Sequence, residues 1–133
     1  MSPTISCSDV YKIFGNNART LLSESGGNVD AKKFQEAGCI VGVNNASFDV
    51  NQGEMLVVMG LSGSGKSTLL RCISRLTDAT SGKILIDGED ICLMNNKQLI
   101  ELRREKMGMV FQSFALLPHK TVLENIAFPL QIK

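Results

Sequence analysis

The chain has 133 residues, of which 44% are hydrophobic and 20% charged, and its formal net charge is +1. This length suits one compact domain with a hydrophobic core, and the balanced charge excludes a strongly basic nucleic-acid-binding protein. The N-terminus has no basic start followed by a long apolar run, and no stretch reaches the roughly 18 apolar residues that a membrane helix needs. We therefore expect a cytosolic chain that reaches a membrane only through a partner.

The four cysteines are widely separated, form no C-x-x-C pair and are accompanied by a single histidine, His119. A zinc site would have to be assembled from scattered ligands, so we expect free thiols in a reducing compartment. We expect His119 to be a surface loop residue rather than a catalytic base, although its place between LLP and KTV also suits an interface.

In chain order, the first distinctive segment is a polar stretch, residues 16–38. We expect it to be a surface insertion with one short helix over residues 30–37, closed by Gly38. Residues 40–50 alternate in part between apolar and polar side chains and predict a strand. The turn NQGE joins this strand to residues 54–59, a continuous apolar run typical of a strand buried on both faces.

The second half of the chain predicts further helices and strands. An amphipathic pattern that begins at Lys66 predicts a helix. KILIDGEDI predicts a short strand with an Asp-Gly turn, NNKQLIELRREKMG an exposed helix ending at Gly108, and MVFQ a short buried strand. Thr121 and Glu124 have the spacing of a capping box for a last helix, which Pro129 limits or kinks.

The segment GLSGSGKS, residues 60–67, fits the pattern G-x-x-x-x-G-K-[ST] between a predicted strand and a predicted helix. Glycines let successive N–H groups point inward at phosphate oxygens, and the positive end of the following helix adds to the attraction. Lys66 then reaches the β and γ phosphates, Ser67 offers a hydroxyl to Mg²⁺, and Thr68 contacts the α phosphate. The predicted nucleotide-binding residues of this segment are Gly60, Ser62, Gly63, Ser64, Gly65, Lys66, Ser67 and Thr68.

Asp87, in KILID, is a superficial candidate for the carboxylate that usually holds the metal ion beside such a loop. However, Asp87 begins the turn DGED, and the segment that separates it from the loop must hold a whole helix. We therefore expect a hairpin turn at this position rather than a metal ligand.

Three segments together resemble the ATP-binding subunits of ABC transporters, most closely those of the glycine betaine/proline (quaternary amine) uptake type. They are VYKIFG, GEMLVVMGLSGSGKSTLLRCISRLTDATSGKILIDGEDI and MGMVFQSFALLPHKTVLENIAFPL. The polar insertion is similar to that subfamily as well, so the resemblance covers nearly the whole chain. It implies an α/β fold, in which residues 1–133 form the N-terminal part of a single ABC ATP-binding domain: a P-loop NTPase core with an antiparallel β subdomain.

The resemblance also implies roles for an aromatic residue and a glutamine that lie outside the loop. Phe14 stacks on adenine, with Tyr11 as the alternative, and Gln112 contacts Mg²⁺ and the attacking water, so that it is catalytic together with Lys66. Residues 107–131 hold the glutamine loop and the start of the helical subdomain, and the part after Gln112 faces the membrane subunit. The alternatives are that Phe14 belongs to the core and that Gln112 only caps a strand.

On this resemblance the protein binds ATP and Mg²⁺, pairs with a second ATP-binding subunit, and energises permease subunits at the inner face of the plasma membrane. The family's L-S-G-G-Q signature, the strand ending in an Asp-Glu pair and the switch histidine do not occur in the 133 residues. We therefore expect a chain truncated before the signature helix and the second acidic motif, and inactive in hydrolysis by itself.

Two other interpretations stay open. A non-catalytic nucleotide-binding or interaction fragment would need none of those missing groups. A P-loop small-molecule kinase would share GLSGSGKST, which also resembles the loop of adenylylsulfate kinases. The hairpin SGKILIDGEDI and the segment MVFQ suit the transporter family rather than a kinase.

Overall fold

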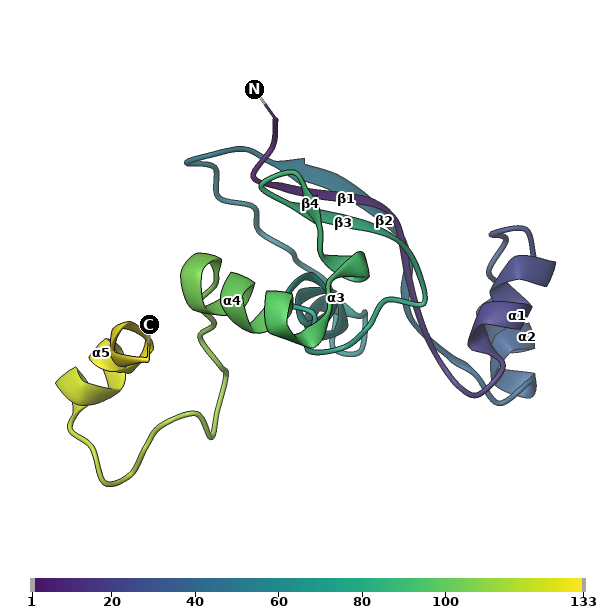
Figure 1. Cartoon of the computed structure of the whole chain (residues 1–133). Helices are drawn as coiled ribbons and strands as arrows, with labels where there is room; N and C mark the ends of the chain where they lie inside the picture. Colours follow the sequence, from purple (N-terminus) through teal and green to yellow (C-terminus); the bar gives the residue numbers. More distant parts are fainter. Residues whose placement is uncertain (1, 133) are drawn as a thin grey trace. The chain divides into compact units, whose positions relative to one another are not determined.

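The computed structural model describes residues 2–132, and the contacts divide the chain into two units, Met1–Leu93 and Met94–Lys133. The first unit holds β1 (Ile5–Phe14), α1 (Ala18–Glu24), α2 (Ala31–Glu36), β2 (Ile40–Val50), α3 (Lys66–Ile73), β3 (Ser81–Ile86), β4 (Glu89–Asp90) and the 3₁₀ turn η1 (Ile91–Leu93) (Figure 1). The second unit holds α4 (Asn96–Lys106) and α5 (Val122–Gln131). None of the helices in residues 2–132 is both long and apolar enough to cross a membrane.

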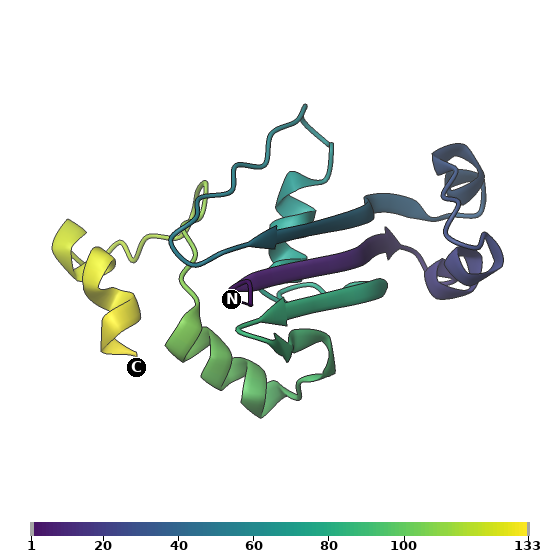
Figure 2. The ribbon, with the colours of Figure 1, turned by 90° about the horizontal axis from the view of Figure 1, so that it is seen from above.

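The first unit is built on an antiparallel sheet with the strand order β2-β1-β3-β4. Figure 2 shows β1 between β2 and β3, with α3 against one face of the sheet and α1 and α2 beyond the end of β1. Fully buried side chains from β1, β3 and η1, namely Val10, Ile84 and Ile91, lie in the core. The sheet is the antiparallel subdomain that the sequence resemblance implied.

The pairing of β1 with β2 is interrupted near the middle of the sheet. Lys12 pairs with Val43, and the next residue, Ile13, pairs with Val41. Gly42 is therefore an extra residue on β2, which is the definition of a β-bulge. Bulges bend a strand and change the direction of the neighbouring backbone, and this one lies next to the start of α3.

A threonine side chain completes the hydrogen bonding of β1 on the side of β3. The Ile13 N–H donates to Thr80 Oγ1 at 2.9 Å, and the same hydroxyl donates to the Ile13 carbonyl at 3.1 Å. The Thr80 N–H also donates to the Tyr11 carbonyl at 2.8 Å. Because Ile13 is only 2% exposed, its N–H cannot turn to water if this hydroxyl is lost.

We expect Thr80→Val to lower the free energy of unfolding by about 2 kcal/mol, because it leaves a buried N–H without an acceptor while keeping the side-chain volume. Urea unfolding followed by circular dichroism measures the effect. Thr80→Ser keeps the hydroxyl and is the matched control, which we expect to unfold near the wild-type midpoint. A Thr80→Val variant as stable as the wild type, or no more destabilised than Thr80→Ser, would contradict the role of the hydroxyl.

The insertion of residues 16–38 holds two helices, where the sequence predicts one. Helix α2 begins as expected at Asp30, whose carboxylate accepts from the N–H groups of Lys32 and Lys33. Helix α1 was missed because no side chain caps its start and no acidic residue lies in its first turn, so it lacks the usual local signals.

The insertion also has a core of its own, so it is more than a surface loop. The buried members of this core are Tyr11, Ile13, Ala18, Leu22, Phe34 and Cys39. Tyr11, the alternative candidate for base stacking, is 9% exposed, and its hydroxyl donates to the Gly27 carbonyl at 3.4 Å. Tyr11 thus anchors the insertion to β1.

Two predicted strands do not form, and both predictions were wrong. Residues 54–59 and the segment MVFQ have no strand assignment, and no strand within residues 2–132 pairs with either. Met55 is 88% exposed and Val110 99% exposed. An apolar run predicts burial, but a strand exists only where a second strand accepts its hydrogen bonds, and the described residues supply none.

The turn between β3 and β4 is confirmed. Asp87 and Gly88 have φ values of 49° and 83°, and Ile86 faces Glu89 across the turn. Two successive positive φ values define the hairpin turn that Asp-Gly favours. The Asp87 N–H donates to the Thr4 carbonyl at 2.8 Å. Asp87 therefore joins the β3–β4 turn to the residue that precedes β1.

In the second unit both predicted helices are confirmed. Helix α5 begins with the expected capping box, in which Thr121 and Glu124 each accept from the other's N–H. The hydrogen bond that the carboxylate accepts from the Thr121 N–H is the largest cause that lowers the pKa of the Glu124 carboxyl. Helix α4 begins with a second capping box, of Asn95 and Gln98, and α5 continues past Pro129.

Candidate functional site

The glycine loop of residues 60–67 leads directly into α3. Gly63 and Gly65 have φ values of +80° and +97°, which only glycine adopts without strain. Gly65 is the N-cap of α3, and no side chain accepts from the first N–H groups of the helix. Those N–H groups, and the positive end of the helix, are therefore available to an anion.

The Lys66 side chain folds back over the loop. Its ammonium donates to the carbonyls of Gly60 and Leu61, each at 2.7 Å, and to Ser64 Oγ at 3.3 Å. These three acceptors hold the Lys66 ammonium against the loop. A phosphate chain bound by the N–H groups of the loop would lie next to this positive charge. The loop is stabilised by the residue that the motif predicts to contact phosphate.

The loop also lies directly against β2. A Cβ atom on Gly65 would be 2.0 Å from the Gly42 carbonyl oxygen, so the two backbones touch with no room for a side chain. On the loop's other side, a Cβ on Gly60 would be 2.6 Å from Ser64 Oγ. The sheet and the loop's own side chains therefore fix its path.

The same strand brings Phe14 and Thr68 together. A Cβ on Gly42 would lie 2.8 Å from Phe14 Cε2 and 3.0 Å from Thr68 Cγ2, so the ring and the methyl group both border the place where a side chain of residue 42 would begin. Phe14 is 42% exposed at the end of β1, and the Lys12 ammonium lies 4.8 Å from its ring centroid. A half-exposed ring beside the loop is available for stacking in a way that a core residue is not.

Ser67 and Gln112, the predicted Mg²⁺ contacts, belong to different units. Ser67 is exposed in the first turn of α3, where its hydroxyl is a suitable oxygen ligand. Gln112 is exposed in the irregular segment between α4 and α5. Within residues 2–132 no group of three His, Cys, Asp or Glu side chains could hold a metal ion.

Three cysteines of the first unit, Cys7, Cys72 and Cys92, have thiols with raised pKa values. Burial raises the pKa of the Cys7 thiol to about 11 and also raises the pKa values of Cys72 and Cys92. The thiolate is the reactive form, so the raised pKa values lower the reactivity of these three thiols near neutral pH.

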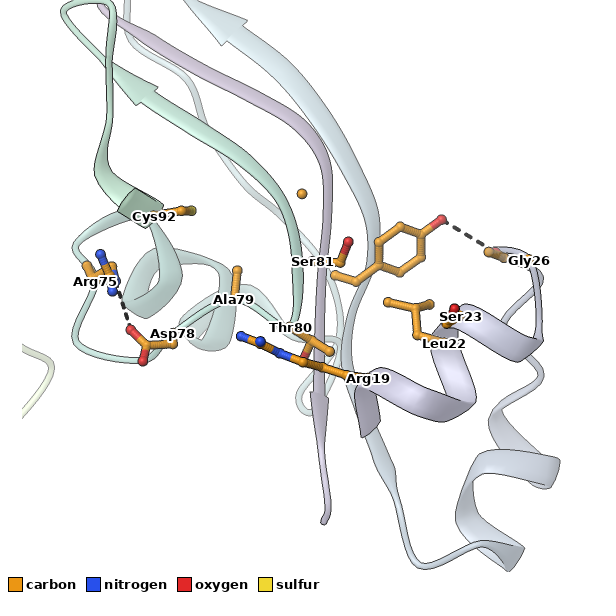
Figure 3. Close-up of a pocket in the computed structure, with 13 residues that line it drawn as sticks. Arg19, Leu22, Ser23, Gly26, Arg75, Asp78, Ala79, Thr80, Ser81 and Cys92 are labelled. Carbon is orange, nitrogen blue, oxygen red and sulfur yellow. Dashed lines mark hydrogen bonds and ion pairs between the residues drawn. The ribbon is translucent and has the colours of Figure 1, made fainter. Parts of the chain in front are cut away.

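A cavity of about 640 Å³ lies between α1 and the segment before β3 (Figure 3). None of its lining residues belongs to the glycine loop. On one side Arg75 is engaged by Asp78 at 2.8 Å and by the Ile91 carbonyl. The cavity is thus separate from the place where the loop, Phe14 and Thr68 converge.

Gly42 is the one residue of this site that no sequence motif indicates. An isolated glycine inside a predicted strand is a weak signal for a bulge or a close backbone approach. The sequence CIVGVNN contains that signal, but nothing in it says which backbone approaches.

Comparison with known proteins gives matches over almost the whole chain. The family model described as ABC transporter matches residues 43–133. The chain is 80% identical over 131 residues to the trimethylamine N-oxide transport system ATP-binding protein TmoW of Pelagibacter ubique, which covers 98% of this chain and 38% of the relative. It is 43% identical over 133 residues to the glycine betaine/proline betaine transport system ATP-binding protein ProV of Escherichia coli, covering 99% and 33%.

Among solved structures, the dimeric structure of MJ0796, a bacterial ABC transporter cassette, matches with a TM-score of 0.72 and 32% identity. The match covers 96% of this chain and 47% of that one. A post-hydrolysis state of the same cassette, bound to ADP and Pi, matches with the same TM-score and 31% identity. The curated relatives are much longer than this chain, which spans 38% of TmoW and 33% of ProV.

Proposed function

Because the chain belongs to the ABC transporter family, we propose that its glycine loop, residues 60–67, binds the phosphates of ATP together with Mg²⁺. The family resemblance drawn from the sequence and the expected α/β fold of an ABC ATPase cassette are both confirmed by the matches above. The observation that carries the proposal is the geometry of the loop, which presents left-handed glycines, an uncapped helix start and the Lys66 ammonium at one place.

In this proposal each part of the site meets a different part of the nucleotide. The backbone from Gly60 to Gly65 and the first N–H groups of α3 surround the β and γ phosphates, and Lys66 leaves its carbonyl acceptors for phosphate oxygens. Thr68 reaches the α phosphate, and the exposed face of Phe14 stacks on the base. Mg²⁺, held by Ser67 and Gln112, would neutralise charge on the phosphate oxygens.

The wider role that we propose is the energising of an importer for a quaternary amine or a related methylated amine oxide. The names of the relatives support that substrate class, and the dimeric neighbour supports a second ATP-binding subunit as partner. Permease subunits would dock on the part of residues 107–131 after Gln112, which would hold the protein at the inner face of the plasma membrane. Exposed apolar side chains on α5, such as Leu123 at 74% and Ile126 at 70%, support a docking surface there.

Hydrolysis, for which the 133 residues lack the signature and the Asp-Glu pair, is proposed for a full-length member of the family rather than for this chain alone. Gln112 would orient the attacking water beside Mg²⁺, and Lys66 would stabilise charge that develops on the γ phosphate. The related cassette bound to ADP and Pi supports hydrolysis as the family reaction.

The test is ATP binding by the purified chain, measured by calorimetry with Mg²⁺, in the wild type and in Lys66→Ala. A hydrogen bond to a charged group contributes about 1.5–3 kcal/mol, so we expect the loss of Lys66 to weaken binding by roughly 10- to 150-fold. Lys83→Ala, which removes an exposed lysine from β3, is the matched control and should bind like the wild type. No binding by the wild type, or equal binding by Lys66→Ala, would contradict the proposal.

A further inference from the structure

We propose that Gly42 is a positioning residue that holds the base-stacking ring of Phe14 in register with the phosphate loop. The inference rests on the nucleotide binding proposed above and adds a residue to it that no motif includes. Its basis is that one glycine on β2 contacts the ring, the loop and the first turn of α3 together.

The space at Gly42 is closed from several sides. A Cβ there would meet Phe14 Cε2 at 2.8 Å, Thr68 Cγ2 at 3.0 Å and the Lys12 carbonyl at 3.3 Å. Its backbone has no positive φ, so alanine meets no backbone strain at this position. Any effect of a side chain at residue 42 therefore comes from these contacts alone.

The bulge explains why a glycine of β2 reaches the loop at all. Gly42 is the extra residue between the pairs Lys12–Val43 and Ile13–Val41, so it is not held opposite a partner on β1. Its carbonyl oxygen is instead the atom that a Cβ on Gly65 would approach to 2.0 Å. The carbonyl group of Gly42 thus contacts the phosphate loop. The Phe14 ring lies where a side chain of residue 42 would begin.

An added methyl group would move the ring rather than the helix. Thr68 is followed by Leu69, which is 7% exposed, and one turn of α3 further on lies Cys72, which is 1% exposed, so the helix is fixed in the core. Phe14 is the last residue of β1 and is 42% exposed, so its ring can swing away into solvent. Gly42→Ala would therefore weaken contact with the base while it leaves the phosphate loop in place.

The experiment compares two ligands that share the phosphates but not the base: ATP and inorganic tripolyphosphate, each with Mg²⁺. We expect Gly42→Ala and Phe14→Ala each to weaken ATP binding by about 5- to 150-fold, the range for loss of one base–aromatic stack. Tripolyphosphate binding should stay within about twofold of the wild type, because it senses only the loop. The double variant should bind ATP no more weakly than Phe14→Ala, since both changes remove the same contact.

Asn44→Ala, an exposed change two residues along β2, is the control and should bind both ligands like the wild type. Unchanged ATP binding by Gly42→Ala, an equal loss for both ligands, or additive losses in the double variant would each overturn the inference. A wild type that binds neither ligand would instead overturn the proposed function.

A second variant covers the case in which Gly42→Ala does not fold. Thr68→Ser removes the methyl group at 3.0 Å and keeps the hydroxyl, so Gly42→Ala combined with Thr68→Ser has one contact fewer to accommodate. Measured against Thr68→Ser alone, this combination should lose affinity for ATP and keep its affinity for tripolyphosphate. Equal affinity for ATP in the two would overturn the inference.

Discussion

Gly65→Ala is expected to abolish measurable nucleotide binding by the chain and to destabilise the first unit. The backbone of Gly65 has a φ of +97°, and the new Cβ would lie 2.0 Å from the Gly42 carbonyl oxygen. The left-handed backbone alone costs about 1–2 kcal/mol for a residue with a side chain. The overlap cannot be relieved by a rotamer change, because the atom it meets is backbone.

The loop must therefore move off β2, and the first N–H groups of α3 move with it. Since these groups and Lys66 all have to meet the same phosphates, we expect at least a 100-fold loss of ATP affinity. Calorimetry with ATP and with tripolyphosphate measures this loss, which should be equal for the two ligands because the phosphate site itself is disturbed.

Gly53→Ala separates the two causes. Gly53 has a similar φ of +77°, but a Cβ there meets nothing within 4 Å. It should lower the free energy of unfolding by about 1–2 kcal/mol and leave ATP binding intact. Retained ATP affinity in Gly65→Ala would mean that the loop binds phosphate without the close contact to Gly42.

Gly82→Ala is expected to have the largest effect on stability. A Cβ on Gly82 would lie 2.3 Å from the Asp9 carbonyl oxygen and 2.6 Å from Val10 Cα, and its φ is +100°. Residues 81 and 11 are paired across β3 and β1, so the clash lies between two central strands of the sheet. The strands can relieve it only by separating, which would expose the fully buried Val10 and Ile84.

We expect the free energy of unfolding to fall by about 3 kcal/mol or more, combining left-handed strain with loss of core packing. Urea unfolding followed by circular dichroism gives the value. Gly88→Ala is the control, because its φ is +83° and a Cβ there meets nothing within 4 Å. It should lose only about 1–2 kcal/mol, and equal losses in the two variants would refute the role of strand contact.

The parts of the fold that the sequence predicts well are those encoded within a few residues. The capping box of Thr121 and Glu124, the cap at Asp30 and the Asp-Gly turn each join atoms no more than three positions apart. The motif of the glycine loop belongs to the same class because its glycines, Lys66 and Ser67 are close in sequence, whereas the path of the loop also depends on its contact with β2. Such features need no distant partner, so the local sequence is enough.

The apolar segments show the opposite case. Residues 54–59 and MVFQ are apolar enough to predict buried strands, yet strand structure depends on a neighbouring strand that local sequence does not contain. The insertion is similar: Phe34 and Leu22 form a core with Tyr11, which a reading of residues 16–38 alone would not reveal.

By itself, the sequence determined the family and the loop motif on which the proposed phosphate site rests, because the glycine, lysine and serine pattern lies in consecutive residues. Only the tertiary structure decided that Gly42 lies between Phe14 and Thr68, that its carbonyl touches Gly65, and that Tyr11 is a core residue. The physical reason is that these are contacts between backbones and side chains far apart in the chain. The effect of a side chain at a glycine position can be judged only when the atoms that surround that position are known.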